Sequence, residues 1–348
     1  MQILENVSLA QYTTFNIGGP ARFFCIVRDE GELMESVKLA QQKRCRMLVL
    51  GGGSNILISD AGFPGLVIKN EMKGVSIIRE DDLSALVRVA AGEPWDGFVD
   101  WAVSRGLSGI ENLSAIPGTA GAVPVQNIGA YGAEASGVIA SVRVLDIHAM
   151  KFVDLSNADC RFSYRDSLFK HDKGRYVIVG TDFKLAKGGK PNLEYKDLKE
   201  YFKKKETLHP YTPTPPQPSL REVRDAVIDI RWRKLPDWKL WGTAGSYFKN
   251  PIISAELFKG LRTRYPKLPG YPEPDGRVKV SAAWLIDNIC RSKGTWDGNV
   301  GSYEKQALVL VAKPGATAAE IVEFSNKLMK RIEHETGIKL EAEVEWVN

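Results

Sequence analysis

Apolar residues in the first half of the chain recur in short runs that alternate with helical stretches. The run Met47–Leu50 stops at three glycines, which predicts a strand that ends in a loop. Asp29 and Glu32 form a capping box, which predicts a helix that continues to about Arg44. The same patterns predict a helix over 94–105 and strands over 66–68, 87–91, 141–147 and 176–185.

The pattern changes between residues 187 and 219. This stretch is rich in lysine and then carries five prolines, which indicates a linker and a domain boundary: Pro210, Pro213, Pro215, Pro216 and Pro218. A Ser-x-x-Glu box at Ser219 predicts that a new helix begins there. Further helices are expected over 254–265, 281–289 and 317–336, and strands over 308–311 and 340–347.

The expected last strand carries Glu341, Glu343 and Glu345 at a spacing of two, which places all three on one face. A solvated face is the ordinary interpretation of such a pattern. The functional alternative is that one of the three carboxylates points into a cleft.

Composition narrows the class of protein. A chain of 348 residues is expected to form two or three domains. Its net charge of +5 is too small to indicate the basic surface of a nucleic-acid-binding protein. The four cysteines are scattered, with no Cys-x-x-Cys pair and no histidine at metal spacing, so we expect reduced thiols and no metal site. Residues 1–10 lack the pattern of a signal peptide, and a cytosolic protein is expected.

An uncharged stretch covers residues 112–133, which is long enough to cross a bilayer. It contains Pro117, Pro124, Gln126, Asn127 and four glycines between 118 and 132. Backbone breaks and amides of this kind are costly in lipid, so we do not expect a membrane span.

Two glycine-rich segments are candidates for ligand binding. The first is Gly51-Gly52-Gly53-Ser54-Asn55, whose glycines would let a ligand approach the backbone closely. It matches neither the Rossmann spacing nor the Walker motif, and a plain turn is the alternative.

The second segment is Ile116–Gly132. Its small residues should expose backbone amides to a pyrophosphate, Gln126 and Asn127 suit the edge of a flat heterocycle, and Tyr131 could stack. The alternative is a buried loop that packs two domains together. Two such loops in one half of the chain favour a dinucleotide ligand.

Two further residues could carry chemistry. Arg165, in Phe-Ser-Tyr-Arg-Asp-Ser, could bind a carboxylate through its guanidinium fork, although a surface contact with Asp166 is the simpler interpretation. Ser246 lies among small residues without a Gly-x-Ser-x-Gly elbow, so a hydrolase nucleophile is disfavoured and a turn serine is the default.

Five motifs in order resemble the MurB family, the UDP-N-acetylenolpyruvoylglucosamine reductases of bacterial cell-wall synthesis, in its longer type I form. They are GGGSN at 51–55, GIENLSAIPGTAGAVPVQNIGAYG at 109–132, CRFSYRDSLFK at 160–170, KLPD at 234–237 and GSYFKNP at 245–251. The likeness runs from Thr13 to Val344, nearly the whole chain.

The resemblance implies an α+β chain with an FAD-binding fold of the vanillyl-alcohol-oxidase (PCMH) type. The implied domains are two FAD-binding subdomains, 1–70 and 71–218, and a C-terminal α+β domain, 219–348, that binds a UDP-sugar, with the last strand returning to the active site. It also implies that NADPH reduces a non-covalently bound FAD, which then reduces the enolpyruvyl group to give UDP-N-acetylmuramate. A monomer without nucleic-acid or membrane partners is expected.

The resemblance also implies roles for individual residues. Arg165 and Glu343 would polarise the enolpyruvyl carboxylate and steady the intermediate, and Ser246 would donate a proton to C2. The substrate would contact Tyr195, Lys234, Gly245, Asn250 and Gln306. The cofactor would contact Gly51, Gly52, Gly53, Ser54, Asn55, Ile116, Pro117, Gly118, Ala122, Gln126, Asn127, Gly129, Tyr131, Gly132 and Ile178. The alternatives are a flavin-dependent oxidase of the same fold, and a nucleotide-sugar-binding protein without catalysis.

Overall fold

The computed structural model describes residues 1–208 and 217–348. Four prolines of the predicted linker lie outside these residues: Pro210, Pro213, Pro215 and Pro216. The described chain forms two compact units, the first from residues 1–6, 22–52 and 64–231 and the second from 7–21, 53–63 and 232–348. The division into three domains at residues 70 and 218 remains a prediction.

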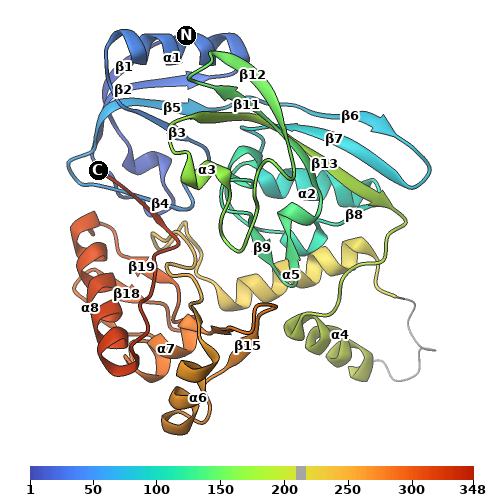
Figure 1. Cartoon of the computed structure of the whole chain (residues 1–348), viewed down its shortest axis with the longest axis vertical. Coiled ribbons are helices and arrows are strands. Elements are labelled where there is room, and N and C mark those ends of the chain that lie inside the picture. The colour runs from blue at the N-terminus through green and yellow to red at the C-terminus, as the bar shows by residue number, and fades with distance from the viewer. Residues whose placement is uncertain (209–216) are drawn as a thin grey trace. The chain divides into compact units, whose positions relative to one another are not determined.

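A four-stranded sheet in the order β1-β2-β5-β3 lies mostly in the first unit, with helix α1 (Glu30–Gln42) packed against it (Figure 1). The Asp29 carboxylate accepts a hydrogen bond from the Glu32 amide at 2.8 Å, as the predicted cap requires. Leu33 and Val37 supply the apolar face of the helix. The strands are β1 (Leu4–Ser8), β2 (Pro20–Val27), β5 (Phe63–Asn70) and β3 (Met47–Leu50).

A larger antiparallel sheet follows in the order β12-β11-β13-β7-β6, with β8 paired to β13. Val177 and Val179 of β13 face the core shared with α1, whereas Ile178 faces helix α2 (Trp95–Ser104). This alternation is that of a strand with both faces buried, and β13 confirms the strand predicted over 176–185. The strands are β6 (Val75–Glu80), β7 (Ser84–Ala90), β8 (Leu107–Ser108), β11 (Ile139–Asp146), β12 (Lys151–Ser156) and β13 (Tyr176–Lys187).

Helix α5 (Leu220–Lys234) begins at the predicted cap, where the Ser219 hydroxyl accepts from the Glu222 amide and the Glu222 carboxylate accepts from the Ser219 amide. It packs against helix α4 (Lys196–Leu208) through a small apolar cluster that includes Leu198 and Val227. The remaining short elements of this unit are α3 (Leu168–His171), β9 (Gly129–Ala130) and β10 (Ala133–Glu134).

The second unit combines three small groups of strands with three helices around one apolar core, to which Phe15, Leu57 and Phe248 contribute. Helix α8 carries the predicted Thr317–Glu320 capping box and ends at Gly337, whose φ is 71°. The helices are α6 (Ala255–Arg264), α7 (Ala282–Asn288) and α8 (Ala318–Thr336). The strands are β4 (Ile56–Ile58), β14 (Ile252–Ile253), β15 (Gly270–Pro272), β16 (Val278–Val280), β17 (Trp296–Asp297), β18 (Val300–Ser302), β19 (Leu310–Ala312) and β20 (Glu345–Val347).

The prediction of one strand over 340–347 is wrong for its first half. Only Glu345–Val347 form a strand, parallel to β4, while Ala342 makes an isolated bridge with Phe248. Glu343 and Val344 form a bend where the segment passes from one partner to the other. Strand alternation therefore does not fix the direction of the Glu343 side chain. Among the described residues, no helix is both long and apolar enough for a membrane span.

Candidate active site

In the first unit, Gly51 and Gly52 lie against the second glycine-rich segment. A Cβ built on Gly51 would be 2.5 Å from Thr119 Oγ1, and one on Gly52 would be 2.5 Å from Gly118 Cα. No side chain larger than hydrogen fits at Gly52 without moving the opposite backbone. The structure thus brings together the loops that the sequence marks as ligand-binding.

Thr119 was not among the predicted site residues. Its Oγ1 is buried and has no hydrogen-bond partner within residues 1–208 and 217–348. A buried hydroxyl without a partner costs free energy, so it favours a ligand that supplies one. A small polar residue inside Ile-Pro-Gly-Thr-Ala-Gly was the only sequence signal for it. This hydroxyl and the glycine contact fit a bound FAD at these loops.

One expectation about the second loop is wrong. The amides of Ala120, Gly121 and Ala122 already donate to the carbonyls of Glu93, Ala91 and Thr119, each at 2.9 Å. They form a short 3-10 turn and are not turned toward a pyrophosphate. Contacts between Ala122 and a cofactor would therefore have to use its exposed methyl group or its carbonyl.

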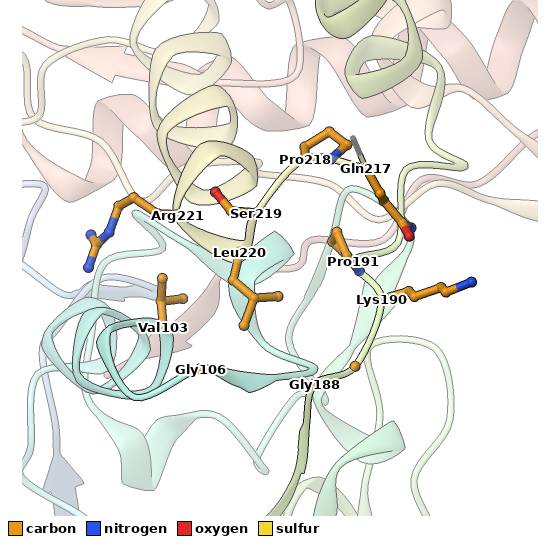
Figure 2. A pocket seen from close by; sticks show the side chains of 11 residues that line it. Val103, Gly106, Gly188, Lys190, Pro191, Gln217, Pro218, Ser219, Leu220 and Arg221 are labelled. Carbon is orange, nitrogen blue, oxygen red and sulfur yellow. The ribbon is translucent and has the colours of Figure 1, made fainter. Parts of the chain in front are cut away.

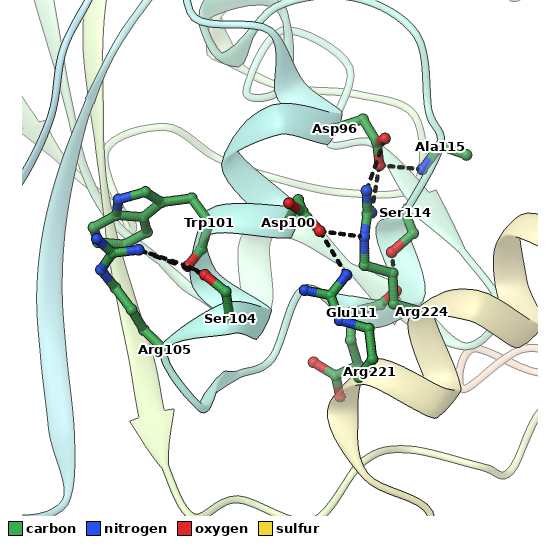
Figure 3. A network of polar contacts seen from close by, with 10 residues as sticks. All are labelled: Asp96, Asp100, Trp101, Ser104, Arg105, Glu111, Ser114, Ala115, Arg221 and Arg224. Carbon is green, nitrogen blue, oxygen red and sulfur yellow. Dashed lines mark hydrogen bonds and ion pairs between the residues drawn. The ribbon is translucent and has the colours of Figure 1, made fainter.

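The start of this loop is anchored from outside. Ala115 has a φ of 57°, and its amide donates to Asp96 of helix α2 at 2.6 Å. The Asp96 carboxylate also accepts two hydrogen bonds from Arg224 of α5, at 2.6 and 3.0 Å (Figure 3). Burial alone would raise the pKa of Asp96, but the hydrogen bonds from Arg224 and Ala115 outweigh it, and the pKa is lowered.

Asn127 does not offer its amide to a heterocycle, contrary to expectation. It is 1% exposed, and its Nδ2 donates to Glu134 Oε2 at 3.0 Å and to the Ser163 carbonyl at 3.1 Å. Its Oδ1 accepts from the Ser136 amide at 2.9 Å. The side chain therefore holds neighbouring loops together, and a direct cofactor contact by it is not supported.

Tyr131 and Tyr195 meet edge to face, with ring centroids 5.4 Å apart. This contact joins a predicted cofactor residue to a predicted substrate residue. Burial raises the pKa of Tyr131 to about 12, against a smaller opposing effect of Arg231, which also hydrogen-bonds its hydroxyl. Asn112 fixes the same region by donating to the carbonyls of Tyr131 and Asn192, each at 2.8 Å.

Arg165 lies in a tight turn closed by two hydrogen bonds between Ser163 and Asp166, each 3.1 Å long. Its φ is 53°, a strained value for a residue with a side chain. The guanidinium Nη2 donates to the Gly129 carbonyl at 2.9 Å, while Asp166 pairs with His171 at 2.7 Å. The guanidinium thus lies against the predicted cofactor segment.

In the second unit, the backbone around Ser246 connects three predicted site segments. Ser246 is half-buried and pairs with Val309 in an isolated bridge, three residues after Gln306. The next amide, of Tyr247, donates to Leu308, and the Tyr247 carbonyl accepts from the Glu343 amide at 2.7 Å. The structure therefore places the backbones of Ser246, Glu343 and Gln306 on neighbouring stretches of chain.

Asn55, which lies in the second unit, also bonds to this group. Its Nδ2 donates to the Glu343 carbonyl at 3.1 Å, and its carbonyl accepts from the Glu345 amide at 3.0 Å. Gly53 is required by its backbone, because φ is 64° and a Cβ there would be 1.9 Å from the Tyr12 carbonyl oxygen. Ser54, between them, is half-buried. In this structure, the motif residues 53–55 support the Glu343 segment.

The other predicted residues are less closely grouped. Asn250 accepts from the Ala282 amide at the start of α7, at 3.0 Å, and Lys234 is the last residue of α5. Gly245 has open space around its α-carbon and a φ of 73°. Ile178 is 8% exposed in the core under α2. Ile116 and Gln126 are half-buried, Pro117 is exposed, and Gly132 has a φ of 81°.

A pocket of 460 Å³ opens elsewhere in the first unit, between the end of α2, the glycines before α4 and the start of α5 (Figure 2). Val103, Gly189 and Leu220 are among its lining residues. No predicted catalytic residue lines it, and its lining residue Gln217 adjoins residues 209–216, which the structure does not describe.

Comparison with known proteins gives matches in both parts of the chain. A family profile described as "FAD binding domain" matches residues 21–154, and one described as "UDP-N-acetylenolpyruvoylglucosamine reductase, C-terminal domain" matches 236–347. The UDP-N-acetylenolpyruvoylglucosamine reductase of Neisseria gonorrhoeae is 46% identical over 99% of this chain and 97% of its own length. The same-named protein of Pseudomonas aeruginosa is 39% identical over 99% and 98%.

A solved structure supports the fold. The crystal structure of UDP-N-acetylenolpyruvylglucosamine reductase (MurB) from Thermus caldophilus matches with a TM-score of 0.68 and 24% identity, over the whole of both chains. These matches confirm the expected α+β class with an FAD-binding fold. Identity at this level over the full length is decisive, and the chain belongs to the UDP-N-acetylenolpyruvoylglucosamine reductase (MurB) family.

Proposed function

We propose that the chain reduces the enolpyruvyl group of UDP-N-acetylenolpyruvoylglucosamine to give UDP-N-acetylmuramate, with NADPH as reductant and FAD as cofactor, in peptidoglycan precursor synthesis. The observation that carries this is the 46% identity to a reductase of that name over 99% of the chain. When bound, FAD would supply the hydride chemistry between NADPH and C3 of the substrate.

The glycine contact defines the proposed cofactor loops. Gly51 and Gly52 allow the two loops to pack against each other at the proposed cofactor site, and Thr119 would hydrogen-bond to the dinucleotide. Helix α2 supports the second loop through the Asp96–Ala115 hydrogen bond. No charged side chain lies between residues 112 and 133, so the loop would bind the dinucleotide through neutral dipoles.

We assign Arg165 to the carboxylate of the enolpyruvyl group. An enol ether accepts hydride poorly unless the charge that develops at C2 is stabilised through that carboxylate. A guanidinium strengthens its interaction as this charge grows, which lowers the barrier. The proposed partner in this role is Glu343.

We assign Ser246 as the proton donor to C2. The carbanion there is a strong base, so a hydroxyl held at about 3 Å can protonate it. The backbone around Ser246 is fixed by its bridge to Val309 and by the Tyr247–Leu308 hydrogen bond. We further propose that the protein is a monomer that acts in the cytoplasm on a diffusible UDP-sugar. It would have no nucleic-acid or membrane partners.

The test is Ser246→Ala, followed by separate measurement of the two half-reactions in a stopped-flow instrument. Bleaching of the flavin by NADPH should be unchanged, while recovery of its absorbance on addition of the enolpyruvyl substrate should slow by about 10²–10⁴-fold, the usual contribution of a general acid. Ser292→Ala is the matched control, because Ser292 is a half-buried serine of the same unit that donates to Cys290 O. Equal slowing of both half-reactions would refute the proton-donor role.

A further inference from the structure

The turn that carries Arg165 is fastened to the predicted cofactor loop at three points. Asn127 Nδ2 donates to the Ser163 carbonyl, Ser167 Oγ donates to the Val125 carbonyl, and Arg165 Nη2 donates to the Gly129 carbonyl. Asn127 and Ser167 are 1% and 0% exposed. Residues 163–167 and 125–129 therefore form one hydrogen-bonded assembly inside the first unit.

The backbone conformation of Asn127 is compatible with its place in this hydrogen-bonded assembly. Its φ is 45°, in the left-handed region that asparagine tolerates better than most residues. All three described bonds of its amide run to protein groups, namely Glu134, Ser136 and Ser163. One buried side chain thus connects the loop of residues 134–136 to the start of the Arg165 turn.

We propose that Asn127 is a positioning residue that sets the placement of the Arg165 guanidinium relative to the cofactor loop. The inference rests on the proposed role of Arg165. The turn has a strained φ of 53° at Arg165 and would relax if its attachment were lost. A guanidinium displaced by about 1 Å can cost on the order of 10²-fold in rate, because the geometry of the reacting groups is no longer held.

The direct test is Asn127→Gly, which removes the side-chain amide. Glycine adopts a positive φ without strain, so the backbone conformation at this position can be kept. We expect recovery of the flavin absorbance by the enolpyruvyl substrate to slow about 10–100-fold. Bleaching by NADPH and the dissociation constant of FAD should stay within about twofold of the wild type, because Asn127 does not bind the cofactor in this assignment. Hydrogen exchange at the amides of Ser163 and Asp166 should accelerate.

Two further variants separate positioning from general damage. Asn157→Ala removes a comparable asparagine, whose two described side-chain hydrogen bonds run to the carbonyls of Ser136 and Ile139 and not to residues 163–167. It should leave both half-reactions unchanged. Ser167→Ala removes the second attachment and should slow the same half-reaction, so the proposal can be tested even if Asn127→Gly fails to fold.

The decisive experiment is a double-mutant cycle with Arg165→Lys. If Asn127 acts through Arg165, Asn127→Gly should change the rate by less than about threefold in the Arg165→Lys background. If Asn127→Gly slows the Arg165→Lys variant by the same factor as the wild type, the positioning role is wrong, although the proposed role of Arg165 stands. The same holds if Asn127→Gly weakens FAD affinity but has a normal rate at saturating FAD. A wild-type rate for Arg165→Lys would instead overturn the proposed role of Arg165, and this inference with it.

Discussion

Four residues around the predicted cofactor loop have left-handed backbone conformations although none is glycine: Ala115, Asn127, Tyr131 and Arg165. Each such conformation costs about 1 kcal/mol or more and persists only where neighbouring groups enforce it. The structure supplies those groups: Asp96 bonds to Ala115, Ser163 to Asn127, Asn112 to Tyr131 and Gly129 to Arg165. At the residue scale, the hydrogen bonds of the loop serve mainly to maintain its shape.

The contact between the two glycine loops gives a prediction for a single residue. In Gly52→Ala the new methyl group would lie 2.5 Å from Gly118 Cα, so the loops must separate. We expect the dissociation constant of FAD to rise by at least about tenfold and the protein to lose about 1–3 kcal/mol of stability, as in other overpacked sites.

Fluorescence titration with FAD measures the first quantity and urea unfolding the second. Gly97→Ala is the control, because its Cβ would meet only Pro94 Cβ at 3.8 Å and it lies in helix α2, where alanine is favoured by about 1 kcal/mol. FAD affinity equal to the wild type in Gly52→Ala would show that the loop contact does not shape the cofactor site.

At the scale of elements, helices α2 and α5 are joined by ion pairs that also reach the cofactor loop (Figure 3). Arg224 is 6% exposed and pairs with both Asp96 and Asp100. A buried guanidinium without its carboxylates would be strongly destabilising. The Asp96 side chain is 41% exposed, so part of this interaction is screened by solvent.

Asp96→Asn should therefore destabilise the protein by about 1–2 kcal/mol at pH 7, a screened fraction of the cost of breaking a buried pair. The pKa of Asp96 is lowered in the folded chain, so its stabilisation is present above the unfolded value of about 3.9 and is lost as the pH falls below it. The difference between wild type and variant should shrink as the pH falls from about 4 through the lowered pKa of the folded chain. Urea unfolding across this range measures it, and a constant difference would contradict the assignment.

At the scale of the whole molecule, cofactor binding should contribute to stability. A ligand that binds only the folded chain at 100 times its dissociation constant adds about 2.7 kcal/mol. We expect the thermal unfolding midpoint to rise with the logarithm of free FAD concentration. The rise should be much smaller at the same concentrations in Gly52→Ala, which serves as the matched variant. A midpoint in the wild type that does not depend on FAD would count against cofactor binding by the native fold.

Much of the secondary structure could be predicted because the signals were local. The structure confirms the capping boxes at Ser219 and Thr317 and the run Met47–Leu50, which needed only near neighbours in sequence. At Asp29 it confirms the cap but not the full box, because the Glu32 carboxylate accepts from the Arg28 amide. The segment Leu340–Val344 could not be predicted, because its bend arises where pairing passes from Phe248 to β4.

The candidate site shows the same difference between features set by near neighbours in sequence and features set by distant contacts. The sequence identified both glycine loops, but not which polar groups the fold would already use. The hydrogen bonds of Asn127 to Glu134 and Ser163, and those of the amides 120–122, form only after distant segments pack together. The feature that marks Thr119 as a site residue, its buried hydroxyl beside Gly51, exists only in the folded chain.

The parallel pairing of β4 with β20 has a consequence for synthesis on the ribosome. Asn55, just before β4, bonds to Glu343, 288 positions later, so the second unit cannot close until nearly all of the chain has been made. At 5–20 residues per second, Ile56–Ile58 would emerge roughly 15–60 s before their partner. Throughout this interval the apolar residues Ile56–Ile58 lack the partner with which they pair in the folded chain, so we expect the nascent chain to bind a chaperone.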